Sequence, residues 1–489
     1  MITDKIFMSN LPFIGRKEEL ASLHDLTHKK TASLVALRGR RRIGKSRLIE
    51  EFARQRKNCR FLPFSGLVPS NTTTADTEKE EFSRQMSVNL GLHQIKADDW
   101  GNMFSYLAKE TKKGKVVILF DEISWMGSKD PTFLGKLKNA WDLEFKKNPE
   151  LIMVLCGSVS AWIEKNILGS TGFMGRFSLV LDLEELSIEE STQFLDQVGF
   201  CDSPYERCKI LGVTGGVPRY LEEIKGNKLA DENIKDLCFK RGGILFREFK
   251  DIFSDIFGHR SELYEKIARA LVQGRKELND IVQAIRLQKS GYLSGYMSDL
   301  VISGFFKRDY VWNITGKTKP RLSYYRLSEN YLRFYLAYIE PNKKEIENGN
   351  FNNKTLSTMP AFDSIMGLQF ENLVLANKKC IIKKLNISME DVASDHPYFQ
   401  RPQSRSKGCQ IDYLIKLKSN VLYACEIKFS RNEVGIGVVS EMQEKIRRLL
   451  RPKGYSVIPV LIHINGVNDS VINSNYFRIV DFSEIMNGV

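Results

Sequence analysis

Three short runs of almost wholly apolar residues stand out in the first part of the chain, at positions 32–37, 116–120 and 151–156. Glycine or acidic residues follow each run, at Gly39, Asp121 and Gly157. Short apolar runs bounded in this way are typical of strands that helices cover on both faces. The pattern therefore predicts an α/β domain with a parallel sheet.

Helical periodicity dominates the next part of the chain. Residues 184–250 read as helices with short breaks, and residues 188–195 carry apolar side chains at helical spacing. Between residues 261 and 337, three helical segments precede two strand-like segments that a Gly-Lys-Thr-Lys-Pro turn joins. Three helices followed by a hairpin resemble a winged helix.

Residues 341–359 are polar and rich in turn-forming residues, including the run Asn-Gly-Asn-Phe-Asn-Asn. This composition predicts a linker between two folded parts. No internal repeat or long low-complexity tract interrupts the rest of the chain.

Strict alternation returns near the C-terminus, at residues 410–417 and 421–428 on either side of a Lys-Ser-Asn turn. The pattern predicts a β-hairpin. If Leu417 faces Val421 across the turn, the same register places Asp412 opposite Glu426. Because like charges so placed repel, we expect a cation between them, either a divalent metal or Lys428.

Composition adds a basic balance but little else. The 489 residues carry a formal net charge of +14, which is consistent with a polyanionic partner and equally with a well-solvated surface. The eight cysteines and six histidines are scattered, which favours reduced thiols over disulfides or zinc sites. No long apolar run or secretion signal is visible, so we expect no membrane association and a cytoplasmic location.

The first apolar run leads into a segment of the form G-x-x-x-x-G-K-S. Its residues are Gly39, Arg40, Arg41, Arg42, Ile43, Gly44, Lys45 and Ser46, and Arg47 continues into a helical stretch. In a strand–loop–helix context this is a phosphate-binding loop, whose backbone amides and helix N-terminus surround phosphate oxygens. We expect Lys45 to reach the β- and γ-phosphates of ATP and Ser46 to offer its hydroxyl to Mg²⁺.

Acidic and hydroxyl residues follow the other two apolar runs. Asp121 and Glu122 end the second run, as in a Walker B motif, where Asp121 would hold Mg²⁺ and Glu122 would align or deprotonate the attacking water. Ser158 follows the third run. Because ligands collect at the carboxyl ends of such strands, Ser158 is either a γ-phosphate sensor or a structural residue.

These motifs resemble the archaeal and bacterial ATPases of the AAA+ and STAND-related group that carry a C-terminal restriction-endonuclease-like domain. The resemblance also rests on residues 13–20 and on the Gly-Gly-Val-Pro-Arg-Tyr-Leu segment at 215–221. It implies that residues 13–20 lie near the adenine and that Pro218 opens a lid helix over the nucleotide. Two features depart from the family: Ser158 stands where Asn is frequent, and the phosphate loop is rich in arginine.

Arg176 follows the sensor run at the place where such ATPases keep an arginine finger. A finger stabilises γ-phosphate charge in cis or from a neighbouring subunit, so a homo-oligomer stays open. The alternative is a surface arginine that ends a loop.

The resemblance also implies a nuclease-like role for the C-terminal hairpin. A Gly-x-x-Phe-Glu helix places Glu371 upstream of Asp412, Glu426 and Lys428, which together match the PD-(D/E)xK pattern of restriction-type nucleases. The resemblance implies that Glu371, Asp412 and Glu426 hold Mg²⁺ and that Lys428 orients water or neutralises phosphate charge. The alternative is a strand pair with incidental charges.

In DNA-binding winged helices the third helix enters the major groove and the wing contacts phosphates. The residues so placed here are Ser290, Tyr292, Ser294 and Tyr296 on the helix and Lys317, Lys319 and Arg321 on the wing. This helix lacks the Arg, Asn and Gln side chains that usually read bases. DNA contact and packing on the ATPase therefore remain equal alternatives.

The sequence thus predicts an α/β protein in five segments: a P-loop ATPase core at 1–183, a helical lid at 184–258, a winged helix at 259–340, a linker at 341–359 and an α/β restriction-endonuclease-like domain at 360–489. The predicted function is Mg²⁺-dependent ATP hydrolysis that gates a nuclease-like domain acting on DNA. The alternative is a STAND-like switch whose C-terminal domain binds nucleic acid or a protein without cleaving. A vestigial ATPase is disfavoured because Lys45, Asp121 and Glu122 are all present.

Overall fold

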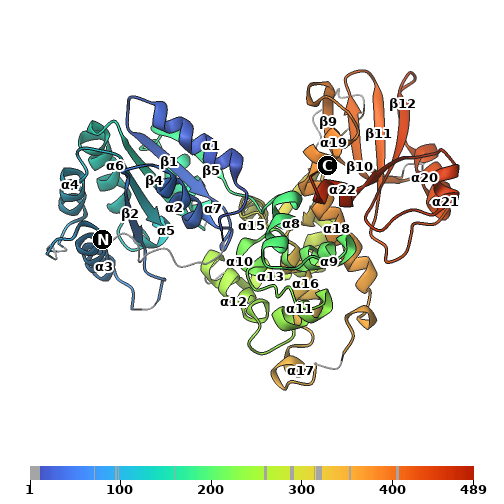
Figure 1. The fold of residues 1–489 in the computed structure, drawn as a ribbon, viewed down its shortest axis with the longest axis horizontal. Helices are drawn as coiled ribbons and strands as arrows, with labels where there is room; N and C mark the ends of the chain where they lie inside the picture. Colours follow the sequence, from blue (N-terminus) through green and yellow to red (C-terminus); the bar gives the residue numbers. More distant parts are fainter. Residues whose placement is uncertain are drawn as a thin grey trace. The chain divides into compact units, whose positions relative to one another are not determined.

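The computed structural model describes residues 12–488 apart from 71, 94, 95, 97, 159, 258–260, 287–290, 313, 315–321, 352, 353 and 403–406. The chain divides into two compact units, Met1–Glu184 and Glu185–Val489 (Figure 1). The first unit ends one residue beyond the boundary expected at 183. The second contains all four segments expected after it.

The first unit is built on the predicted parallel sheet, which is confirmed. Its strands are β1 (Ser33–Arg38), β2 (Arg60–Ser65), β3 (Val116–Asp121), β4 (Leu151–Gly157) and β5 (Phe177–Asp182). They lie in the order β2-β3-β4-β1-β5 with every pairing parallel. Since β3, β4 and β1 are neighbours, the segments that follow them meet at one edge of the sheet.

Helices cover this sheet, as the buried strands β1, β3 and β4 require. They are α1 (Lys17–Asp25), α2 (Lys45–Gln55), α3 (Ala75–Leu90), α4 (Trp100–Glu110), α5 (Ile123–Met126), α6 (Phe133–Leu143) and α7 (Ser160–Ile163), with η1 (Leu26–His28), η2 (Phe145–Lys147) and the π-helix η3 (Glu164–Leu168). An aromatic cluster fills the space between α3, α4 and the sheet, including Phe64, Phe82, Trp100, Phe104 and Phe120.

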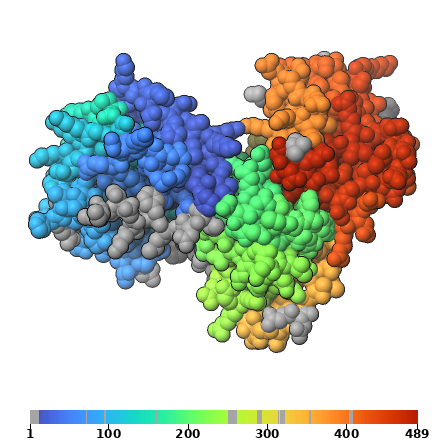
Figure 2. Space-filling model, viewed as in Figure 1, coloured from blue at the N-terminus to red at the C-terminus, as the bar shows by residue number. Residues whose placement is uncertain are grey.

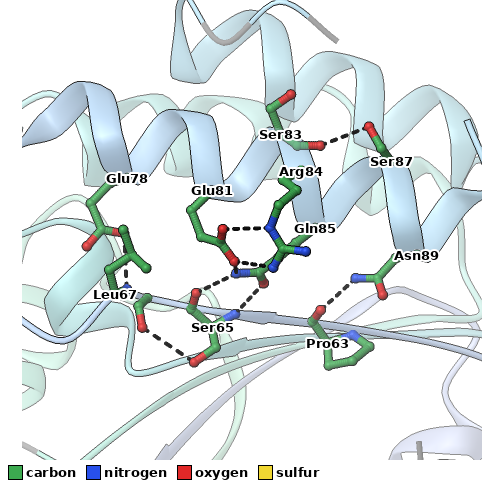
Figure 3. Close-up of polar contacts among 11 residues, drawn as sticks. Pro63, Ser65, Leu67, Glu78, Glu81, Ser83, Arg84, Gln85, Ser87 and Asn89 are labelled. Atoms are coloured by element: carbon green, nitrogen blue, oxygen red, sulfur yellow. Dashed lines mark hydrogen bonds and ion pairs between the residues drawn. The ribbon is translucent and has the colours of Figure 1, made fainter. Parts of the chain in front are cut away.

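Side chains of α3 form hydrogen bonds with backbone groups on the outer edge of strand β2 (Figure 3). The Ser65 amide donates to Gln85 Oε1 at 2.8 Å, and Gln85 Nε2 donates to the Ser65 carbonyl at 2.9 Å. Asn89 Nδ2 donates to the Pro63 carbonyl at 2.6 Å. The backbone groups of residues 63 and 65 point to the same edge of β2, where no strand pairs. Proline, which has no backbone N–H, is therefore tolerated at position 63. The helix thereby protects an edge that could otherwise pair with another strand.

The second unit begins with α8 (Ile188–Gln197), α9 (Pro204–Thr214), α10 (Pro218–Leu221), α11 (Ala230–Cys238) and α12 (Ile244–Phe257). Helices α8 and α9 pack on the C-terminal part of the chain: the Ile188 amide donates to Asn377 Oδ1 at 2.9 Å, and Cys208 Sγ lies 3.5 Å from Met486 Sδ. In the space-filling view the α8–α9 region, in green, lies directly against C-terminal residues in red (Figure 2).

The middle of the second unit contains the predicted three helices and hairpin. They are α13 (Ser261–Ala270), α14 (Leu278–Ala284) and α15 (Gly291–Ile302), then β7 (Phe306–Tyr310) and β8 (Ser323–Leu327), which pair antiparallel. A short strand, β6 (Lys276–Glu277), completes a sheet in the order β6-β8-β7. Ser290, Lys317, Lys319, Arg321 and the side chain of Tyr292, predicted to contact DNA, lie outside the described residues.

The segment expected as a linker, residues 341–359, contains short helices and buried apolar side chains, and its role as a linker stays a prediction. The chain reaches it through α16 (Asn330–Phe334) and the π-helix η5 (Tyr335–Ile339), and it contains α17 (Lys343–Glu347) and η6 (Leu356–Thr358). The Phe351 ring stacks on Phe239 with centroids 4.1 Å apart, and Ile346 and Leu356 are buried. Four buried apolar side chains, those of Ile346, Phe351, Leu356 and Met359, therefore anchor a segment whose composition is otherwise polar.

A mixed sheet forms the last part of the second unit. Its strands are β9 (Val392–Gln400), β10 (Cys409–Leu417), β11 (Val421–Lys428), β12 (Ser456–His463) and β13 (Arg478–Asp481), in the order β13-β12-β11-β10-β9. The helices are α18 (Phe362–Ala376), α19 (Lys378–Lys384), α20 (Gly437–Arg448), α21 (Asp469–Asn473) and α22 (Phe482–Met486), with η7 (Met389–Asp391). Strands β9, β10 and β11 are antiparallel, and β11, β12 and β13 are parallel.

The predicted hairpin register is confirmed: Tyr413 pairs with Cys425 and Lys416 with Leu422, the register in which Leu417 is opposite Val421. All eight cysteines are free, as expected from their scatter. Among the described residues, no helix combines the length and apolar character needed to cross a bilayer.

Candidate functional site

The phosphate loop joins β1 to α2 at the edge of the sheet where β3 and β4 also end. Gly44 has a φ of 91°, a left-handed conformation that suits glycine. A Cβ on Gly39 would lie 2.5 Å from the carbonyl oxygen of Leu183, so the loop passes too close to its neighbour for a larger residue. The Ile43 side chain is fully buried and anchors the loop in the core.

Lys45 occupies the centre of this loop and is 5% exposed. Its Nζ donates to the carbonyl oxygens of Gly39 and Arg40, each at 3.0 Å, and to Ser158 Oγ at 2.8 Å. A buried ammonium is thus held by three neutral acceptors. Phosphate oxygens would be stronger acceptors for this charge, because hydrogen bonds between ionised groups are roughly twice as strong as neutral ones.

Ser46 and Asp121 lie together beside the loop, with Ser46 Oγ donating to Asp121 Oδ2 at 2.5 Å. A hydroxyl and a carboxylate at one point form an oxygen donor set that suits Mg²⁺, which keeps several waters and takes few protein ligands. The predicted magnesium residues of the nucleotide site therefore fit that ion.

Glu122 follows Asp121 in a left-handed conformation with φ 48° and ψ 48°. Such a backbone is costly for a residue with a side chain and is frequent at functional sites. It turns the carboxylate toward the end of β4, where Oε2 accepts from the Ser158 amide at 3.0 Å and Oε1 accepts from the Ser158 hydroxyl. Ser158 therefore connects Lys45 to Glu122.

Arg16 supports the phosphate loop through hydrogen bonds, a role that was not predicted. It is 5% exposed, and its Nη2 donates to the carbonyl oxygens of Ile43 at 3.2 Å and Glu184 at 2.7 Å. The sequence offered only a Gly-Arg pair before a helix. Of the other loop arginines, Arg40 is buried, whereas Arg41, Arg42 and Arg47 are half-buried.

Arg176 is turned toward Asp142 near the end of α6. Its Nη2 lies 2.8 Å from Asp142 Oδ2, and its Nε lies 3.0 Å from Oδ1. The Arg176 guanidinium, with a second contribution from Lys138, lowers the pKa of Asp142 from 3.8 to about 2. A role as arginine finger stays a prediction and requires Arg176 to exchange this partner.

Pro218 is the first residue of α10 and belongs to the second unit. Its segment is tightly packed there: a Cβ on Gly216 would lie 2.3 Å from the carbonyl oxygen of Leu186. The nucleotide contact expected for Pro218 stays a prediction.

The C-terminal carboxylates Asp412 and Glu426 lie on adjacent strands, as predicted. Asp412 Oδ2 accepts from the Ile427 amide at 3.1 Å. Glu426 is 3% exposed and pairs with Lys428 at 3.1 Å and with Lys445 of α20. Burial and the mutual repulsion of these carboxylates raise the pKa of Glu426, and burial with repulsion from Glu371 raises that of Asp412.

Glu371, the third expected metal ligand, is paired instead with a cation. Arg275 Nη2 lies 3.1 Å from Glu371 Oε1, and the two side chains are 11% and 13% exposed. Across the described ranges, no group of three His, Cys, Asp or Glu side chains is placed to hold a metal. The expected set of Glu371, Asp412 and Glu426 is therefore not assembled as a metal site here. Arg275 was not predicted to lie at this site, because nothing in its own neighbourhood marks it.

Comparison with known proteins supports the interpretation of the first unit. Residues 13–224 match a family described as an ATPase domain predominantly from Archaea. An uncharacterized protein of Methanocaldococcus jannaschii is 25% identical over 361 residues, which cover 74% of this chain and 76% of that protein.

Solved structures with a detectable likeness include a Walker-type ATPase of Pyrococcus abyssi, which is 16% identical, has a TM-score of 0.47 and covers 66% of this chain and 96% of that one. The ORC2 protein of Aeropyrum pernix is 14% identical, with a TM-score of 0.44 and coverage of 71% and 98%. The family match supports ATP binding and hydrolysis, and the predicted resemblance to archaeal ATPases is confirmed for residues 13–224. The C-terminal resemblance stays a prediction.

Replacing Ser158 with Ala tests the connection between Lys45 and Glu122. The change removes the hydroxyl that both charged groups contact. We expect kcat for ATP hydrolysis to fall roughly 10- to 100-fold, which corresponds to one hydrogen bond to a charged group. Ser124→Ala is the matched control, since the Ser124 hydroxyl is buried nearby without a hydrogen-bond partner among the described residues. Equal rates for the two variants would remove Ser158 from the site.

The Arg176–Asp142 pair predicts a pH-dependent stability difference. A carboxyl whose pKa is lowered on folding stabilises the protein above its ordinary value of 3.8, and this contribution is lost as pH falls toward about 2. We expect Arg176→Ala to unfold at a lower temperature than the wild type at pH 7. The gap should close between pH 4 and pH 2, as measured by circular dichroism. A gap that persists unchanged at low pH would contradict the pairing.

Proposed function

We propose that this protein is a Mg²⁺-dependent ATP hydrolase that acts on DNA and that uses its ATP state to control its C-terminal domain. The hydrogen-bonded chain Lys45–Ser158–Glu122 is the observation that carries the ATPase part. In this chain of contacts, the Ser158 side chain alone separates the ammonium of Lys45 from the carboxylate of Glu122. The half-buried arginines of the loop add positive charge around the phosphates.

In this proposal Lys45 and the loop amides from Gly39 to Arg47 bind the β- and γ-phosphates, and Ser46 with Asp121 holds Mg²⁺. The γ-phosphate competes with Ser158 for the Lys45 ammonium and takes the Ser158 hydroxyl as a donor. Glu122 then loses one of its two hydrogen bonds and becomes available to accept a proton from water. The Arg176 guanidinium leaves Asp142 and then stabilises the negative charge of the transferred phosphate.

A contact between the expected lid and the C-terminal part of the second unit supports a coupling. The ring of Tyr205 on α9 stacks on Phe429 with centroids 4.8 Å apart, and Phe429 directly follows Lys428. Phe429 also lies 5.4 Å from Phe370, the neighbour of Glu371 on α18. A movement of α9 would therefore reach β11 and α18 together.

A DNA-directed role for the second unit is supported by its topology and by the net charge of the whole chain. The helices α13 to α15 with the β7–β8 hairpin have the order of a winged helix, and the mixed sheet presents Asp412, Glu426 and Lys428 on adjacent strands like a restriction-type nuclease. The net charge of +14 suits a polyanion. DNA is thus the proposed substrate class.

A second candidate is a STAND-like switch whose C-terminal domain binds nucleic acid or a protein without cleaving. The pairing of Glu371 with Arg275 favours it, because this carboxylate is already neutralised. Both candidates require the same ATPase. They differ only in whether Asp412 supports metal-dependent chemistry.

The substitution Glu122→Gln tests the ATPase assignment. Loss of the basic carboxylate should lower kcat roughly 100-fold or more while ATP binding persists, so the variant should retain ATP. ATP turnover and nucleotide retention are measured on the full chain. Glu80→Gln, an exposed change on α3, is the control and should behave as wild type. Normal hydrolysis by Glu122→Gln would refute the role of Glu122.

A nuclease assay separates the two candidates. Wild-type protein is incubated with duplex, single-stranded and branched DNA, with Mg²⁺, and with or without ATP. The first candidate predicts cleavage that Asp412→Ala abolishes while ATPase activity is spared, because the two sites lie in separate units. Asp391→Ala, an exposed change in η7, is the control. Binding without cleavage on every substrate would favour the switch.

A further inference from the structure

Cationic side chains pair with two of the three carboxylates of the C-terminal site. Glu426 pairs with both Lys428 and Lys445, and Glu371 pairs with Arg275. Asp412 has no direct ion pair among the described contacts, but Lys445 and Arg275 are close enough to lower its pKa against the effects of burial and Glu371. Three cations therefore already lie among these carboxylates, and Lys428 also pairs with Glu441 at 2.9 Å.

Arg275 differs from the two lysines in its origin. It precedes β6 in the middle of the second unit, whereas Lys428 and Lys445 belong to the mixed sheet and its helix α20. Its guanidinium lies 4.2 Å from the centroid of the Phe399 ring on β9. The middle segment therefore inserts a cation among residues of the C-terminal part.

The surroundings of Arg275 make its charge effective. Its side chain is 11% exposed, so solvent screens it little. Its Nη1 is buried and has no hydrogen-bond partner within the described ranges. A buried N–H without an acceptor is costly, and a phosphate oxygen is an acceptor that would satisfy it.

A divalent cation entering this site would meet three positive charges that are already in place. Repulsion at partly buried positions is strong, because it grows as the effective dielectric falls. Glu371 can join a metal only when Arg275 leaves it. The guanidinium is suited to that exchange, since it binds phosphate as readily as carboxylate in bidentate geometry.

We propose that Arg275 is a charge lock on the C-terminal site: it holds Glu371 and keeps divalent metal affinity low until a nucleic-acid phosphodiester takes the guanidinium. The lock rests on the proposed function, because it assumes that Asp412 and its neighbours accept a metal. It makes metal binding and nucleic-acid binding cooperative at this site.

Metal affinity tests the lock without using catalysis. Mn²⁺ binding to the full chain is measured by electron paramagnetic resonance in the absence of nucleotide, and the signal lost in Asp412→Asn defines the C-terminal site. We expect Arg275→Gln to bind Mn²⁺ at least about tenfold more tightly than wild type, because one repelling charge is gone. Arg275→Lys keeps the charge and should stay within about twofold of wild type.

Arg401→Gln is the matched control. Arg401 Nε donates to Glu277 Oε1 at 2.9 Å, so this ion pair joins the same two segments without contacting the site carboxylates. The control should bind Mn²⁺ as wild type does. A gain in the control equal to that of Arg275→Gln would show that loosening the contact, not the charge, matters, and would overturn the lock.

Two further measurements keep the proposal testable if Arg275→Gln folds poorly. In wild type, Glu371→Gln should leave Mn²⁺ affinity unchanged, because Glu371 is held by Arg275; a loss as large as that of Asp412→Asn would overturn the lock. Adding a duplex DNA oligonucleotide should tighten the Asp412-dependent Mn²⁺ binding of wild type but not that of Arg275→Gln. Equal tightening of both would also overturn it.

The outcomes distinguish failure of the lock from failure of the proposed metal site at Asp412. Mn²⁺ binding that depends on Asp412 but is equal in wild type and Arg275→Gln refutes the lock and leaves the metal site intact. Absence of Asp412-dependent binding in both proteins refutes the metal site and the lock together.

Discussion

Parallel pairing of β4 with both β1 and β3 is the constraint on which the nucleotide site depends. The carboxyl ends of the three strands meet at one edge, so the phosphate loop, Ser158 and the Asp121–Glu122 pair come together although they are far apart in the chain. Lys45 then contacts Ser158, and Ser158 contacts Glu122. The left-handed backbone of Glu122 is strained, and it directs the Glu122 carboxylate toward Ser158.

The second unit depends on a different device, a network of buried polar side chains around α18. Asn372 on α18 contacts Arg326 of β8 at 2.5 Å and Asn330 of α16 at 3.0 Å. Arg333 is 2% exposed and donates to the Leu327 carbonyl at 2.7 Å. Because a buried polar group without its partner is costly, such a network fixes one arrangement of the elements that share it. The middle helices and the C-terminal sheet are therefore parts of one body.

Local pattern was sufficient for some features and not for others. The apolar runs predicted β1, β3 and β4, and the turn at Lys418 to Asn420 predicted the register of β10 and β11, because strand alternation and turn length act over a few residues. The packing of residues 341–359 was not predicted, because a few spaced apolar residues look incidental in a polar run. Arg16 and Arg275 were missed because their function comes from contacts with distant segments, and nothing in their own neighbourhood marks them.

The two candidate sites differ in what they lack. At the nucleotide site a buried ammonium rests on neutral carbonyl and hydroxyl oxygens, so an incoming polyanion replaces weak acceptors with charged ones. At the C-terminal site each paired carboxylate already has a cation, so an incoming metal must first displace one. The first site is prepared for its ligand by the fold itself. The second needs a change elsewhere, and the stack of Tyr205 on Phe429 gives α9 a direct contact through which such a change could arrive.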